Sequence, residues 1–196
     1  MNREHVKIIK NTPFGHIVIL WGMKDHSTII RNVFIPRPDM SAEDQILEIY
    51  PDFHEFSCPE IDELANSIEK FLKGEDIIFS LDMLDLNNCS LFQKSVLQAL
   101  SDIPKGKVSS YHLLAKYLGN EKGARAVGNA LSCNPFPIII PCHRVIRSDG
   151  TLGGFQGGLD MKKALLKNEG IKFDNNGKLI SIVPTTPENN NAQKTL

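Results

Sequence analysis

Residues 109–133, SSYHLLAKYLGNEKGARAVGNALSC, decide the fold of the C-terminal half of this chain. Ser109 or Ser110 can cap a short helix over YHLLAKYL, because a serine hydroxyl accepts a hydrogen bond from the free amides of the first turn. Gly119 and Asn120 break that helix, and a second one, ARAVGNALSC, ends before an Asn-Pro dipeptide. The order of helix, tight turn and helix predicts a helix-turn-helix.

The second of these helices consists mostly of small residues around a single arginine, Arg125. A glycine inside a helix costs about 1 kcal/mol relative to alanine, so the close approach of another surface should offset it. Two surfaces are open at this point: another helix of the same domain, or a narrow groove of duplex DNA with Arg125 reaching into the base stack. The small residues are Gly123, Ala124, Ala126, Gly128 and Ala130.

The segments on either side complete a mostly α-helical domain over residues 88–180. Before the helix-turn-helix, Ser90 and Gln93 open a helix with one apolar face. After it we expect a short buried strand in PIIIP (137–141), a strand and turn like the wing of a winged helix in 143–153, and a closing helix in MKKALLKNEG (161–170).

The N-terminal half, residues 1–87, predicts a small α/β domain. GHIVILWGM (15–23) and STIIRNVFIPR (27–37) are β-branched, apolar runs that predict an antiparallel hairpin. Capping signals at Ser41 and Ser57 open two helices, and DIIFSLDML (76–84) predicts a further strand. Residues 181–196 are polar and rich in Pro and Asn, so we expect a disordered tail.

Composition gives a globular chain with an uneven charge. Apolar content is 41%, the start lacks the apolar run of a signal peptide, and no stretch has the length of a membrane span, so we expect a cytoplasmic protein. Residues 1–87 have a net charge of −8 and residues 88–180 a net charge of +7. The basic half therefore predicts a polyanionic partner.

The four cysteines, Cys58, Cys89, Cys133 and Cys142, form no CxxC pair. Disulfides are not expected in a chain without an export signal. The spacing of Cys133, Cys142 and His143 fits no common zinc pattern, so we predict no metal.

The candidate nucleophile is Cys142, which lies between Pro141 and the bases His143 and Arg144. These neighbours favour a thiolate, and lowering a thiol pKa from 8.5 to about 7 raises the thiolate fraction about 15-fold. That gain is small, so the site also needs a pocket that holds an electrophile in line and a proton donor for the leaving group. A cysteine hydrolase is an alternative, but it gains nothing from a basic helix-turn-helix.

Several of these motifs, read together, resemble the O6-alkylguanine-DNA alkyltransferases, also called methylated-DNA–protein-cysteine methyltransferases. The resemblance spans about residues 88–171 and rests on FQKSVLQAL, IPKGKVSSY, HLLAKYLG, GARAVGNAL, NPFPI, PCHRV, GGFQGG and LLKNEG in the family's order. It implies an RNase-H-like α/β domain followed by a winged-helix-like catalytic domain. It also implies a monomer without a cofactor that binds double-stranded DNA.

The resemblance further implies a reaction that each molecule performs once. An O6-alkylated guanine is flipped out of the duplex, and its alkyl group passes to Cys142; O4-alkylthymine stays open as a second substrate. His143 takes the thiol proton through a water, Glu169 holds that histidine, Tyr111 protonates the departing guanine, and Asn134 braces the active-site turn. Arg144 is expected to be structural, bridging the domains through an N-terminal acid.

For DNA, the resemblance places Arg125 in the gap left by the flipped base. Ala124, Ala126, Gly128 and Tyr111 complete the DNA-facing set, and Pro137 and Phe155 line the alkyl pocket. Three positions depart from many relatives: Phe155 where tyrosine is common, Asn129 where some have glycine, and Ser132 where some have arginine. The competing function is a non-catalytic protein that binds alkylated bases or regulates transcription, which the helix-turn-helix alone permits.

Overall fold

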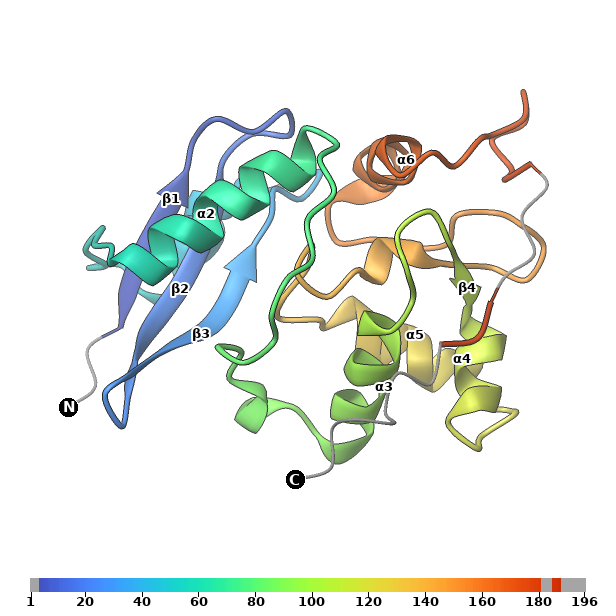
Figure 1. Cartoon of the computed structure of the whole chain (residues 1–196), viewed down its shortest axis with the longest axis horizontal. Coiled ribbons are helices and arrows are strands. Elements are labelled where there is room, and N and C mark those ends of the chain that lie inside the picture. Colours follow the sequence, from blue (N-terminus) through green and yellow to red (C-terminus); the bar gives the residue numbers. More distant parts are fainter. Residues whose placement is uncertain (1–3, 181–184, 188–196) are drawn as a thin grey trace. The chain divides into compact units, whose positions relative to one another are not determined.

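The computed structural model describes residues 4–180 and 185–187 (Figure 1). Its contacts divide the chain into two compact units. The first is formed by the described residues up to Asn88 with Pro135–Ile139 and Gln156–Met161; the second by Cys89–Asn134, Ile140–Phe155 and the described residues from Lys162 onward. The sequence predicted one domain over residues 88–180, whereas Pro135–Ile139 and Gln156–Met161, which lie within that range, belong to the first unit.

A three-stranded antiparallel sheet, in the order β1-β2-β3, forms the first unit (Figure 1). The strands are β1 (His5–Ile9), β2 (Ile17–Lys24) and β3 (Ser27–Phe34). The predicted hairpin is confirmed as β2 and β3, and both of its turn residues, Asp25 and His26, have positive φ, as a type I′ turn requires. Strand β1 is not among the elements predicted from the sequence.

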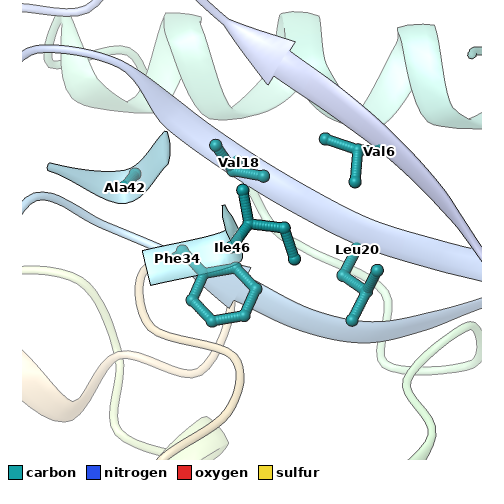
Figure 2. Close-up of a cluster of buried hydrophobic side chains, with 6 residues drawn as sticks. All are labelled: Val6, Val18, Leu20, Phe34, Ala42 and Ile46. Carbon is teal, nitrogen blue, oxygen red and sulfur yellow. The ribbon is translucent and has the colours of Figure 1, made fainter. Parts of the chain in front are cut away.

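Two helices accompany this sheet, α1 (Ala42–Ile49) and α2 (Pro59–Leu72). Six consecutive residues of β2 are buried, so both faces of this strand are covered. Figure 2 shows Ala42 and Ile46 of α1 packed on side chains of all three strands, and the cluster is Val6, Val18, Leu20, Phe34, Ala42 and Ile46. The Ser41 cap is confirmed, but the predicted Ser57 cap of α2 is wrong: Cys58 takes the N-cap position, because Pro59 is the first helical residue, and its side chain makes no capping hydrogen bond.

The strand predicted over 76–84 is wrong except at its end. Only Leu84 forms a bridge, with Ile30, whose amide donates to the Met83 carbonyl at 2.7 Å. Ile78 is 96% exposed, so the apolar pattern here is not buried against a sheet. A 3₁₀ turn, η1 (Leu86–Asn88), follows.

The second unit begins with the predicted helices. They are α3 (Leu91–Ser101), α4 (Tyr111–Tyr117) and α5 (Ala124–Ser132), and the side chains of Ser90 and Ser110 cap the first two. Two-residue strands β4 (Ser109–Ser110) and β5 (Val145–Ile146) pair in parallel, and α6 (Gly158–Asn168) closes the fold. Its core includes Val108, Ile146, Leu152, Leu166 and Ile171.

The segment PIIIP is not a strand. Ile138 has a φ of +76°, a conformation that β-branched residues rarely adopt, so the chain turns where the sequence predicted extended backbone. In the predicted tail, the Thr185 amide donates to the Val108 carbonyl at 2.8 Å and Pro187 is buried; residues 181–184 and 188–196 lie outside the described residues. Within the described ranges, none of the helices has the length and apolar character of a membrane span.

Candidate active site

Cys142 lies at the start of a single 3₁₀ turn, η2 (Cys142–Arg144), which takes in His143 and Arg144, where the sequence predicted the beginning of a strand. The turn forms because the Arg144 amide donates to the Pro141 carbonyl at 3.0 Å, directly after a residue whose ring fixes φ. Cys142 and His143 therefore do not point to opposite sides as strand neighbours do. The thiol residue is only 6% exposed.

Asn134 holds this turn from the end of the helix-turn-helix. Its side-chain amide donates to the Ile140 carbonyl at 3.1 Å, and its side chain also hydrogen-bonds Cys142. Burial raises the pKa of the Cys142 thiol, while the Asn134 hydrogen bond and the positive charge of Lys162 act against that rise. The expectation of a lowered thiol pKa is therefore wrong for this state of the protein, in which the thiol keeps its proton.

His143 and Glu169 form a buried pair beside the thiol. The Nε2 of His143 lies 2.8 Å from Glu169 Oε1, and both side chains have at most 2% exposure. Burial lowers the pKa of His143 and keeps the ring neutral, although Glu169 opposes this effect. The second ring nitrogen, Nδ1, is the one with which His143 can accept a proton.

Arg144 explains why Glu169 is ionised inside the protein. The Nε and Nη2 of Arg144 donate to the Glu169 carboxylate at 2.9 to 3.1 Å, and its Nη1 donates to the Ile103 carbonyl at 2.6 Å. Burial alone would raise the pKa of Glu169, but the hydrogen bond of His143 and the hydrogen bonds and positive charge of Arg144 lower it to about 2. The ion pair of Arg144 is thus with Glu169 of the same unit, and the expected pairing with an N-terminal acid is wrong.

Tyr111, the first residue of α4, directs its hydroxyl toward the loop 152–154. The hydroxyl accepts a hydrogen bond from the Gly154 amide, and it lies so close to Gly153 that a Cβ there would meet it at 2.8 Å. Burial raises the pKa of Tyr111, and the nearby Cys142 raises it further, so the hydroxyl remains a proton donor.

Arg125, Ala126, Asn129 and Ser132 give α5 an exposed face, while Val127, Ala130 and Leu131 are buried. Gly123, just before this helix, and Gly128, within it, are explained in different ways. A Cβ at Gly123 would meet the Asn120 side chain at 2.7 Å, so the turn requires glycine there, whereas a Cβ at Gly128 would meet the Tyr111 ring at an ordinary 3.8 Å. Packing inside the unit therefore does not require glycine at 128, which favours an outside surface such as a DNA groove.

Comparison with known proteins agrees with this geometry. Residues 91–171 match the family model described as 6-O-methylguanine DNA methyltransferase, DNA binding domain. A methylated-DNA–protein-cysteine methyltransferase of Haemophilus influenzae is 33% identical over 168 residues, 85% of this chain and 87% of that protein. The chain belongs to this family.

Other members of the methyltransferase family match over different shares of their length. The protein of this name from Methanothermobacter thermautotrophicus is 46% identical over 114 residues, 58% of this chain and 64% of that protein. A crystal structure of Mycobacterium tuberculosis OGT in complex with DNA is 31% identical, with a TM-score of 0.64 over 84% of this chain and 92% of that one. The mixed α/β fold with a small sheet is therefore shared.

The methyltransferase resemblance predicted an alkyl pocket from Pro137 and Phe155. The Phe155 ring meets the His143 ring edge-on, with centroids 6.5 Å apart, inside the second unit. Pro137 is buried in the segment Pro135–Ile139, which belongs to the first unit. The pocket itself therefore stays a prediction. In the described part of the chain, no group of three His, Cys, Asp or Glu side chains is arranged to hold a metal.

Sequence reasoning missed two features of this methyltransferase site, Gly153 beneath Tyr111 and the buried Lys162 of α6. Lys162 was detectable, because it precedes Leu165, Leu166 and Glu169 at helical spacing and so shares their buried face. Gly153 gave no signal, since a glycine in GGFQGG is as well explained by the turn itself.

The close contact between Gly153 and Tyr111 gives a testable expectation for Gly153→Ala. The new methyl group must displace the Tyr111 hydroxyl, and φ at this position is +67°. We expect transfer to slow about 100-fold, the lower end of what proton donation contributes, with a stability loss of about 1–2 kcal/mol. Single-turnover repair rates and urea unfolding measure the two effects.

Gly150→Ala is the matched control, because φ there is +82° but a Cβ would meet nothing within 4 Å. It carries the backbone strain without the contact with Tyr111. Equal rates for the two variants would show that the contact does not matter.

Proposed function

We propose that this protein repairs duplex DNA by moving the alkyl group of an O6-alkylguanine onto the sulfur of its own Cys142. The observation that carries the proposal is a buried thiol in a rigid turn, beside a neutral histidine that is paired with an ionised glutamate. A thiol placed in this way can give up a proton at the moment of reaction. The family membership of the chain supports the same activity.

In the proposed step, the Sγ–carbon bond forms as the bond between the alkyl carbon and guanine O6 breaks. The thiol proton moves to His143 Nδ1, directly or through a water, and the resulting imidazolium is stabilised by the Glu169 carboxylate at 2.8 Å. The guanine leaves with a developing negative charge and takes a proton from the Tyr111 hydroxyl. The proton held by His143 restores Tyr111 through solvent, so one proton leaves the thiol and one ends on guanine.

The product of this step is a thioether, and none of the site residues named here is suited to hydrolyse it. We therefore propose a single transfer for each protein molecule. Asn134 keeps its proposed role because it bonds both the turn and the thiol. O6-alkylguanine is the proposed substrate, and O4-alkylthymine is a second substrate to be tested in the same assay.

The proposed DNA surface is the exposed face of α5, with Arg125 filling the place of the flipped base and Ala124, Ala126 and Gly128 allowing close approach. Small side chains let the helix axis lie near the duplex, and an extra-helical guanine needs a side chain to occupy its gap. Tyr111 joins this surface at the reacting base. The departures at Asn129 and Ser132 lie on the same exposed face, so they modify the contact with DNA and leave the chemistry unchanged.

We expect Arg125→Ala to slow repair of duplex DNA by about tenfold or more. Flipping the guanine out of the duplex costs a few kcal/mol. Without the side chain that fills the gap, the flipped state is less stable and the activation free energy of transfer rises. The matched substrate is the same oligonucleotide as a single strand, for which no gap opens and the effect should be under about twofold. Equal slowing on both substrates would argue against the proposed role of Arg125.

At the level of fold, the RNase-H-like and winged-helix-like labels and a monomeric state are also proposals, as is a cytoplasmic location. The helix-turn-helix of α4 and α5 followed by the short β5 supports the second label. Sedimentation with and without DNA tests the monomeric state.

The deciding experiment mixes the protein with duplex DNA carrying one O6-methylguanine and digests it with trypsin. Cleavage after Arg125 and Arg144 yields one peptide, residues 126–144, that contains both Cys133 and Cys142. Fragmentation of this peptide must place one methyl on Cys142, while the exposed Cys133 serves as the internal control. Tight DNA binding with an unmodified Cys142 would support a non-catalytic binder, and repeated turnover would support a hydrolase.

A further inference from the structure

Lys162 is a charged side chain with none of its surface exposed. Lysine is among the residues least often fully buried, because its ammonium group loses the hydration that stabilises it in water. The residue lies in α6, in the part of the helix that belongs to the second unit. The proposed mechanism above assigns it no task.

The ammonium group of Lys162 donates to three main-chain carbonyl oxygens. The acceptors are Val145 at 2.6 Å, Leu152 at 2.5 Å and Gly154 at 3.1 Å. An ammonium has three donors, so these bonds use its full capacity. One side chain thereby fixes three points of the backbone relative to one another.

These three carbonyls lie in two segments of the proposed site: the backbone that follows the nucleophile and the loop against which the proton donor lies. Val145 directly follows the turn that carries the nucleophile, η2 (Cys142–Arg144). Leu152 and Gly154 flank the glycine against which the Tyr111 hydroxyl lies, and the Gly154 amide donates to that hydroxyl. Lys162 thus connects the backbone next to the Cys142 turn with the loop against which the Tyr111 hydroxyl lies.

The charge of Lys162 acts on the same site. Its hydrogen-bond acceptors are neutral carbonyls, so its positive charge extends to its surroundings, where Cys142, His143 and Arg147 interact with it electrostatically. Burial, with Arg147 adding to it and Cys142 opposing it, lowers the pKa of Lys162 to about 8. Near neutral pH the side chain is therefore still largely cationic.

We propose that Lys162 is a positioning residue of the transfer reaction: it ties the loop under Tyr111 to the backbone after the nucleophile and directs a positive charge at the Cys142 sulfur. The inference rests on the proposed function for its effect on repair. Its effect on the thiol is independent of that function, because any small electrophile reports on it.

The test compares the full-length wild type with Lys162→Met and Lys162→Gln. Methionine removes the charge and the donors at similar length, and glutamine removes the charge but keeps an N–H donor. The matched control is Lys167→Met, which removes a charge from the exposed face of the same helix. The first readout is the pH dependence of Cys142 alkylation by iodoacetamide, followed on the peptide of residues 126–144 with Cys133 as reference.

We expect both Lys162 variants to slow the alkylation of Cys142 about tenfold near neutral pH, where Lys162 is still charged, and the difference from the wild type to shrink above about pH 8, where the lysine loses its proton. The profile of Cys133 and that of the Lys167→Met control should stay in place. The second readout is single-turnover repair of the O6-methylguanine duplex, which should slow about tenfold or more in Lys162→Met with unchanged affinity for undamaged duplex. A smaller loss in Lys162→Gln would reflect its remaining donor.

Urea unfolding separates this role from a structural one, because only variants that unfold in a cooperative transition are compared. If Lys162→Met does not fold, Lys162→Gln takes its place. An alkylation profile of a folded variant that coincides with that of the wild type overturns the proposal. Failure of the wild type itself to methylate Cys142 would instead overturn the proposed function, and the iodoacetamide profile would still decide the influence of Lys162 on the sulfur.

Discussion

Replacing Cys142 by serine should abolish repair of an O6-methylguanine duplex, with a loss of about 10⁴-fold or more in the single-turnover rate. A serine hydroxyl is a much weaker acid than a thiol, and the buried site already disfavours the anion even of the thiol. His143 therefore cannot generate the nucleophile. The measurement is the loss of methyl from the DNA together with the mass of the peptide of residues 126–144.

The matched control for this change is Cys133→Ser, which alters an exposed thiol in the same peptide. We expect it to repair at the rate of the wild type. Cys142→Ser should also keep its affinity for the damaged duplex, because the exchange of sulfur for oxygen leaves the exposed face of α5 unchanged. Methyl transfer by Cys142→Ser at the wild-type rate would refute the assignment of the acceptor.

The second large effect is expected for Glu169→Gln, on stability as well as on rate. The change leaves the Arg144 guanidinium buried without its carboxylate, and removing one partner of such a pair is costly. A shift of the Glu169 pKa from 4.5 to about 2 corresponds to about 3 kcal/mol of folding free energy near neutral pH. Urea unfolding should show this loss, and transfer should slow because the imidazolium of His143 loses its counter-charge.

The pH dependence gives the sign of this effect. The folded-state pKa of Glu169 lies below its unfolded value of 4.5, so its contribution is fully present above that pH and is lost as the pH falls toward 2. The difference in unfolding free energy between wild type and Glu169→Gln should therefore shrink as the medium is acidified below about pH 5. Glu121→Gln, an exposed acid of the same unit, should stay within about 0.5 kcal/mol of the wild type. A difference that does not change with pH would contradict the assignment.

The parts of the fold that the sequence predicted are those specified by local chemistry. The caps at Ser41, Ser90 and Ser110 form as predicted, because the hydrogen bond of a cap joins residues only a few positions apart. The strand prediction for 76–84 was wrong. These residues have the composition of a strand, but a strand also needs a neighbouring strand to pair with, and in this segment only Leu84 forms a bridge.

Within the site, the sequence identified the reacting groups but not their ionisation. The proximity of His143 and Arg144 to Cys142 in sequence suggested a lowered thiol pKa, whereas the pKa is raised because the turn buries the sulfur. Arg144 neutralises Glu169, a residue 25 positions further along, and so contributes less to the thiol than its neighbouring position implied. Pairings of this kind depend on tertiary packing, which sequence spacing does not encode.

The groups that we place in the chemistry, together with the arginine of α5, all come from one uninterrupted run of the chain, from Tyr111 to Glu169. A single genetic exchange can therefore carry the whole reactive set into another gene, without the segment that precedes it. The family model matches residues 91–171, which include this run.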